Sequence, residues 1–297
     1  MTEHSSKKIG IFGLLIASFF WGAEFVVEKD VLSVMGANCS NAIRFFIAGI
    51  IMTAISVPHR KKITKKDVIN GVVTGAFMGL GFAFQTMGLG FIHAGENALL
   101  SSAYILIIPI AEWVLFRKRQ EYTIFIYATV AMIGIGLISY DPSGKSWNFS
   151  IGEIMTLAGS LFYAGAIISI NKLSVETDPK ILTTLQFYMI TIISVVLAIF
   201  IEEIPRVCSP GIIVEFIYLI LFATIGAQAL MNHCIRFVSS SAAGIIFSSE
   251  SIFAAVLGIL ILGEPSNLYL WAGIILIVGS IALYNTGLPR RGKDIKS

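Results

Sequence analysis

The stretch FVSSSAAGIIFSSESIFAA, residues 237–255, repeats the pattern of an earlier stretch, FIHAGENALLSSAYILIIP, residues 91–109. Both stretches are apolar along most of their length, and both carry polar residues near the centre. At this offset of 146 residues, Glu250 aligns with Tyr104. Because a carboxyl group is costly in a segment made for lipid, Glu250 is tolerable if it faces an aqueous cavity shared by the two matched segments.

The repeat extends outward from these stretches over nearly the whole chain. Residues 17–29 align with residues 159–171 at an offset of 142, and the same offset aligns Arg44 with Gln186. The preserved order of the matches predicts two related halves, which we place at residues 1–140 and 141–297.

Composition places both halves in a membrane. Hydrophobic residues make up 56% of the chain, charged residues only 13%, and the mean hydropathy is +0.84, which no water-soluble surface can accommodate. A membrane-spanning helix needs roughly 20 predominantly apolar residues. Ten stretches meet this requirement: residues 9–27, 41–57, 68–89, 97–116, 122–140, 151–171, 181–201, 212–233, 242–262 and 268–284.

The positions of lysine and arginine predict how these segments are oriented. With the N-terminus inside, the outer segments receive only Lys29, Lys145 and Arg206, whereas the inner segments and the tail receive nearly all other basic residues. This bias predicts ten spans with both termini cytoplasmic. Each half then holds five spans, an odd number, so the second half enters the membrane in the opposite sense. The expected fold is an all-α integral membrane protein of ten transmembrane helices in two inverted five-helix repeats.

Several functional classes are disfavoured. The three cysteines have neither a CxxC spacing nor a pairing pattern, so neither a disulfide framework nor a metal site is expected. Basic clusters are short loop segments without interleaved aromatics, so no nucleic-acid partner is expected. SYDPSGKS, residues 139–146, lacks the first glycine of a phosphate-binding loop, and no cofactor or nucleotide-driven pump is predicted.

Two alternatives to a transporter stay open. An intramembrane enzyme would need a nucleophile with a base, or a metal cluster, but the four histidines are dispersed and no HExxH motif occurs. A membrane scaffold or sensor would show no polar midpoint shared between halves and usually carries an appended soluble domain. Neither expectation of that class fits this sequence.

Glu250 is the main candidate for a functional residue. A charged residue in the middle of a span costs about 2.5 to 3.5 kcal/mol on insertion scales, so it usually faces a cavity or a partner. A carboxyl group in such a site can exchange a proton as the cavity changes sides. Contact with a substrate amine is a second role, and a neutral glutamate hydrogen-bonded for packing is a third.

Other polar and aromatic residues within the spans are candidates to line the same cavity. Repeat-matched aromatics and amide side chains form this group: Trp21, Gln85, Asn97, Tyr104, Tyr163, Gln186, Gln228 and Asn232. Amides at such positions hydrogen-bond either a solute or a neighbouring helix. We expect a gate or a structural ion pair between Glu24 and Arg44, with Glu28 as a competing partner. Pro109 is a candidate flexing point in the span that contains Tyr104.

Four motifs together resemble the EamA-type branch of the drug/metabolite transporter superfamily. They are WGAEF at residues 21–25, RF at 44–45, GLGFIHAGENALLSSAYILIIPI at 88–110, and RFVSSSAAGIIFSSESIFAAVLGILILGEPSNLYLWAGIILIVGS at 236–280. The last motif is the most specific, and the resemblance covers nearly the full chain.

This resemblance implies a multi-pass carrier in the inner membrane of a bacterial cell. Such carriers move small organic solutes, often amino acids or related metabolites, outward by alternating access. Since no nucleotide-binding motif is found, proton-coupled exchange, electrogenic uniport and facilitated diffusion all stay open as modes of transport. The first four helices of each half are implied to line a central cavity, while the fifth and tenth pack at the periphery. The resemblance leaves the substrate open.

Overall fold

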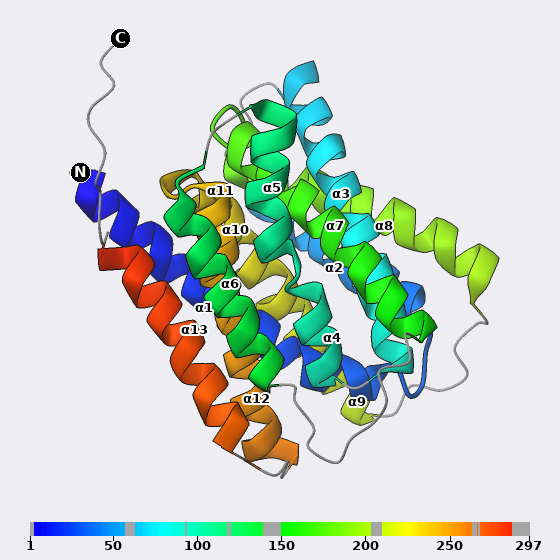
Figure 1. The fold of residues 1–297 in the computed structure, drawn as a ribbon. Coiled ribbons are helices and arrows are strands. Elements are labelled where there is room, and N and C mark those ends of the chain that lie inside the picture. The colour runs from blue at the N-terminus through cyan, green and yellow to red at the C-terminus, as the bar shows by residue number, and fades with distance from the viewer. Residues whose placement is uncertain are drawn as a thin grey trace.

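The computed structural model describes residues 3–56, 63–92, 94–117, 120–138, 150–202, 210–262, 266 and 268–286. Within these ranges the chain is helical, with no β-strand (Figure 1). The helices are α1 (Glu3–Val31), α2 (Ala37–Ser56), α3 (Lys65–Phe91), α4 (Ala94–Ser101), α5 (Tyr104–Phe116), α6 (Tyr122–Ile138), α7 (Ile151–Leu173), α8 (Pro179–Ile201), α9 (Pro210–Tyr218), the π-helical η2 (Leu219–Gly226), α10 (Ala227–Cys234), the 3₁₀ turn η3 (Ile235–Phe237), α11 (Ser240–Phe247), α12 (Ser249–Leu262) and α13 (Leu268–Thr286).

The helices have the length and composition of membrane spans. In the described ranges, seven helical stretches are long and apolar enough to cross a bilayer, and two of them, Gly211–Phe237 and Ser240–Ile261, each join several of these elements. Three shorter apolar helices cover Tyr104–Phe116, Tyr122–Leu137 and Leu268–Leu283. The outer surface is apolar too, since Phe200 and Leu268 expose about four fifths of their surface. The prediction of an all-helical membrane protein is therefore confirmed.

Several helices begin at capping residues that the sequence supplies. Thr64 and Asp67 form a reciprocal capping box at the start of α3, and Ser150 and Glu153 form another at the start of α7. In each box a side-chain oxygen accepts from a main-chain N–H that lacks a partner in the first helical turn. These caps fix where α3 and α7 begin, and the two helices then pack along one another.

Two of the predicted spans are interrupted near their centres. Residues 97–116 divide into α4 and α5, and residues 242–262 divide into α11 and α12. The tightened turns are equivalent, because the N–H of Ile105 donates to the Ser102 carbonyl at 3.0 Å and that of Ser251 to the Ser248 carbonyl at 3.3 Å. At the repeat offset of 146, the acceptor and donor residues of the first bond align with those of the second.

Serine side chains bond back to the preceding turn at both interruptions. The Ser102 hydroxyl donates to the Ala98 carbonyl at 2.8 Å, and the Ser248 hydroxyl donates to the Ile245 carbonyl at 2.6 Å. Hydroxyls that bond back to the preceding turn compete with the helical main-chain ladder and bend it. Pro109, the predicted flexing point, lies within α5, after the interruption.

The two halves of the chain interleave. Helix α3 runs along α7 and α8, α2 along α8, α6 along α13, and α1 along α10 and α12, and Figure 1 shows α6 beside α13. Glycines allow the closest approaches. A Cβ atom added to Gly22 of α1 would lie 2.6 Å from the Phe253 Cβ and 2.7 Å from the Glu250 carbonyl oxygen on α12. Helix α1 therefore touches α12 directly beside the second interruption.

Candidate functional site

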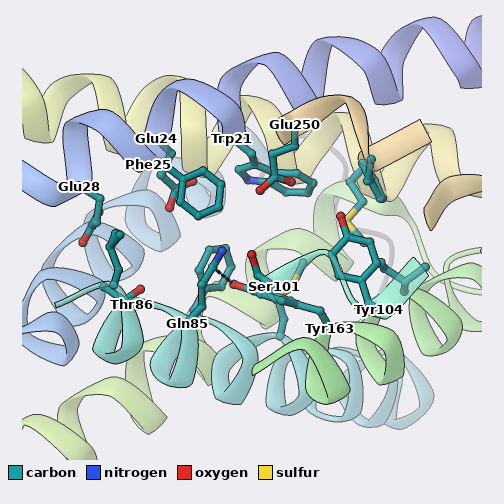
Figure 2. A pocket seen from close by; sticks show the side chains of 16 residues that line it. Trp21, Glu24, Phe25, Glu28, Gln85, Thr86, Ser101, Tyr104, Tyr163 and Glu250 are labelled. Atoms are coloured by element: carbon teal, nitrogen blue, oxygen red, sulfur yellow. Dashed lines mark hydrogen bonds between the residues drawn. The ribbon is translucent and has the colours of Figure 1, made fainter. Parts of the chain in front are cut away.

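A cavity of about 50 Å³ lies between these helices, which is room for a few water molecules. Helices α1, α3, α7 and α10 contribute to its walls together with both interrupted segments (Figure 2). Its lining residues are Trp21, Glu24, Phe25, Glu28, Met78, Phe82, Gln85, Thr86, Leu89, Ser101, Tyr104, Tyr163, Ile167, Met231, Phe247 and Glu250.

The two helix interruptions meet at this cavity. Ser101 and Tyr104 flank the first interruption, Phe247 and Glu250 flank the second, and all four line the cavity. The hydroxyl oxygens of Ser102 and Ser251 lie 3.4 Å apart. The tightened turns of the two halves are thus in direct contact beside the cavity.

Glu250 is buried and its side chain faces the cavity. Only 8% of its surface is exposed, and among the described residues its carboxyl group has neither a hydrogen-bond partner nor an ion-pair partner. Figure 2 shows the carboxyl group next to Trp21 on the same side of the cavity. A buried carboxyl group without a fixed partner is available to a proton or to a solute.

Aromatic rings line the same cavity as this carboxyl group. The ring centroids of Trp21 and Phe247 are 5.3 Å apart, and those of Tyr104 and Tyr163 are 6.4 Å apart. Two rings are held by polar contacts: the Trp21 indole N–H donates to the Ala223 carbonyl at 3.0 Å, and the Tyr163 hydroxyl donates to Gln85 Oε1. The cavity wall is therefore aromatic and rigidly positioned where it borders Glu250.

The other carboxyl groups of the cavity are tied to Arg44. Its guanidinium group is fully buried and pairs with Glu24 at 2.6 Å and with Glu28 at 2.8 Å. Both partners that the sequence offered are used, because the planar guanidinium group presents separate nitrogens to each carboxylate. The Ser40 hydroxyl also donates to Glu28 at 2.8 Å, and the rings of Phe45 and Phe82 lie 4.8 and 5.1 Å from the guanidinium carbon.

Three of the candidate amides form a cluster of their own outside the cavity lining. Gln186 Nε2 donates to the Thr74 hydroxyl at 2.9 Å, and Gln186 Oε1 accepts from Asn232 at 2.6 Å and from Gln228 at 3.2 Å. At the repeat offset, Gln186 corresponds to Arg44. One half therefore carries a charged cluster and the other an uncharged amide cluster.

Asn97 and Pro109 also lie outside the lining. Asn97 Nδ2 donates to the Thr156 hydroxyl at 2.8 Å and to the Gln85 carbonyl at 3.1 Å, which ties α4 to α7 and α3. Pro109 is buried in α5. Of the predicted cavity residues, the structure thus brings together Trp21, Gln85, Tyr104, Tyr163 and Glu250, with Glu24 from the predicted ion pair.

Sequence reasoning did not single out much of the apolar lining. Phe25, Met78, Leu89, Ile167 and Met231 face the cavity, yet nothing in their residue types separates them from residues that face lipid. Ser101 and Ser102 had a usable signal, because they align with the polar centre of the later segment.

Comparison with known proteins agrees with this picture. The profile of the EamA-like transporter family matches residues 8–140 and 150–286. A protein of Archaeoglobus fulgidus named "Uncharacterized transporter" is 29% identical over 271 residues, which covers 91% of this chain and 84% of the relative. "Uncharacterized transporter YwfM" of Bacillus subtilis is 25% identical over 291 residues, which covers 96% of each chain.

A solved crystal structure shares the fold. It is 14% identical in sequence, and the two chains superpose with a TM-score of 0.79 over 97% of this chain and 99% of the other. At this identity the likeness concerns the fold alone.

Proposed function

Because the chain belongs to the EamA-like transporter family and is a multi-pass membrane transporter rather than an enzyme, we propose that it moves a small organic solute by alternating access through the cavity beside Glu250. The observation that carries this proposal is the cavity where the two interrupted segments meet. Discontinuous helices commonly form substrate sites in transporters built from inverted repeats, since the site then belongs to both halves.

For the architecture we propose ten membrane spans in two inverted five-helix repeats, with both termini in the cytoplasm of a bacterial cell. Each of the ten stretches predicted from the sequence overlaps helix in the described residues. The equivalent positions of the two interruptions support the repeat, and the distribution of lysine and arginine supports the orientation.

For energy coupling and direction we propose proton-coupled export. The support for coupling is the position of Glu250, whose carboxyl group lines the cavity and has no fixed partner within the described residues. The ion pairs of Arg44 with Glu24 and Glu28 lie at the edge of the same cavity. We propose that they close it toward one side of the membrane.

The test is transport by purified protein in proteoliposomes. A panel of anionic, cationic, zwitterionic and neutral metabolites is offered with and without an imposed pH gradient. We expect at least one solute to move faster than in protein-free vesicles, with a rate that depends on the gradient. Vesicles with the protein in either orientation then report the direction. If no solute of any charge class moves, transport through this cavity is refuted.

A further inference from the structure

We propose that the solute carries a cationic amine and has no free carboxylate, an inference that rests on the transport function proposed above. The charges of the cavity lining are the first argument. Glu24, Glu28 and Glu250 contribute three carboxyl groups, whereas no lysine, arginine or histidine is among the described residues that line the cavity. A site with this balance attracts a cation and repels an anion.

The basic residues near the cavity are already engaged. Arg44 is held by Glu24 and Glu28 together, at 2.6 and 2.8 Å. The ammonium group of Lys29 donates to the main-chain carbonyls of Leu89 and Ile92, at 2.6 and 2.8 Å. A carboxylate on the solute would therefore have to displace one of these contacts to find a positive partner.

Glu250 is left as the one lining carboxyl group that Arg44 does not compensate among the described residues. Its carboxyl group lies beside Trp21, as Figure 2 shows, and Trp21 in turn contacts the ring of Phe247. Ring faces attract cations through their quadrupole, most strongly when water is excluded. A carboxylate with adjoining aromatic rings is a combination suited to an ammonium group on an apolar body.

A zwitterionic amino acid fits this site poorly. Its ammonium group would meet Glu250, but its carboxylate, only two bonds from the ammonium nitrogen, would be forced to lie among the same acidic side chains. Like charges brought together in a desolvated site oppose binding. The family resemblance suggested amino acids or related metabolites as solutes. The charges of the cavity favour, within that range, amines that lack the carboxylate.

Matched ligands test this directly on the purified full-length protein. We use three triads that share a hydrocarbon or indole body and differ in their polar groups, with an ammonium group, an ammonium group and a carboxylate, or a hydroxyl: isobutylamine, valine and isobutanol; phenethylamine, phenylalanine and 2-phenylethanol; tryptamine, tryptophan and tryptophol. Binding is measured by calorimetry. In at least one triad we expect the amine to bind at least about tenfold more tightly than both partners. The proposal is overturned if no amine exceeds its amino acid and its alcohol.

Two variants locate the interaction. Glu250→Gln keeps the shape of the side chain but removes its charge, and we expect it to weaken amine binding at least about thirtyfold. Glu112→Gln is the matched control, since Glu112 is also a buried carboxyl group but lies outside the cavity lining, where it accepts from Gln120 and Ser241. Melting temperatures without ligand verify that both variants are folded. Unchanged amine binding in Glu250→Gln would also overturn the proposal.

The outcome is separable from that of the proposed function. If anionic or neutral solutes move in proteoliposomes while no amine binds preferentially, transport stands and the cation selectivity fails. If amines bind preferentially but no solute moves, the selectivity of the site stands and the transport function fails.

Discussion

Glu250 combines features that sequence reasoning could only list as alternatives. It is buried, it lines the cavity, and the described residues offer its carboxyl group no fixed partner. The third alternative was a glutamate hydrogen-bonded for packing. Among the described residues, no hydrogen-bond partner of the Glu250 carboxyl group supports it.

Replacing Glu250 by glutamine is expected to remove the pH dependence of transport. Glutamine cannot bind or release a proton, so the rate of solute movement should no longer change with pH. The measurement is transport in proteoliposomes at a series of pH values, with Glu112→Gln as control. A variant whose pH profile matches that of the native protein would refute proton coupling at this residue.

Replacing Arg44 by glutamine is expected to destabilise the protein strongly. The change leaves Glu24 and Glu28 without their buried partner, which typically costs about 3 to 5 kcal/mol. The effect is measured as the free energy of unfolding in detergent. Adding Glu24→Gln and Glu28→Gln to the same variant should recover part of this loss.

The matched control for Arg44 is Lys66→Gln. Lys66 pairs with Glu176 at 3.1 Å, but the two side chains are 64% and 43% exposed. An exposed pair of this kind contributes about 0 to 1 kcal/mol. Similar losses in Arg44→Gln and Lys66→Gln would show that the buried cluster is not a stabilising unit.

At the scale of the helix, most of the fold was predictable and the interruptions were not. Apolar length and lysine and arginine placement are properties of whole segments, so they locate helices well. A tightened turn depends on which main-chain carbonyl the serine hydroxyl donates to, as at Ser102 and Ser248. The sequence does not show which carbonyl that is. The amides show the same limit, because Gln186 and Gln85 look equivalent in sequence, yet only Gln85 lines the cavity.

Replacing Gly22 by alanine is expected to separate α1 from α12. The added methyl group would meet the Phe253 Cβ and the Glu250 carbonyl oxygen at under 3 Å. Overpacking of this kind costs about 1 to 3 kcal/mol. We expect a lower melting temperature and weaker solute binding, because Glu250 is displaced.

The matched control for Gly22 is Gly136→Ala on α6, where an added Cβ atom meets nothing within 4 Å. Alanine is favoured over glycine within a helix by about 0.5 to 1 kcal/mol, so this variant should be as stable as the native protein or slightly more stable. If the two variants have the same melting temperature, contact between α1 and α12 at Gly22 is not a constraint.

At the scale of the whole molecule, the contact between Ser102 and Ser251 joins the two halves where the solute is expected to bind. Alternating access requires parts of the two halves to move relative to one another. A covalent link at this contact is therefore expected to arrest transport without unfolding the protein.

The link is made by Ser102→Cys with Ser251→Cys in a chain whose three native cysteines are replaced by serine. The native hydroxyl oxygens are 3.4 Å apart, so the introduced sulfurs lie close enough to form a disulfide on oxidation. Transport should stop after oxidation and recover after reduction, while the rate of each single-cysteine variant should respond to neither treatment. Full activity of the oxidised double variant would show that this contact does not move.

The uncompensated carboxyl group of Glu250 also has a consequence for membrane voltage. If the ionised carboxylate binds a cation, the empty and loaded cavities differ by one elementary charge, and only the empty form carries the uncompensated charge. The free energy of one elementary charge changes by about 2.3 kcal/mol when it crosses the whole membrane at a potential of 100 mV. The membrane potential should then change the rate at which the empty protein with an ionised Glu250 reorients, and leave nearly unaffected the reorientation of the protein that has bound a cation or a proton.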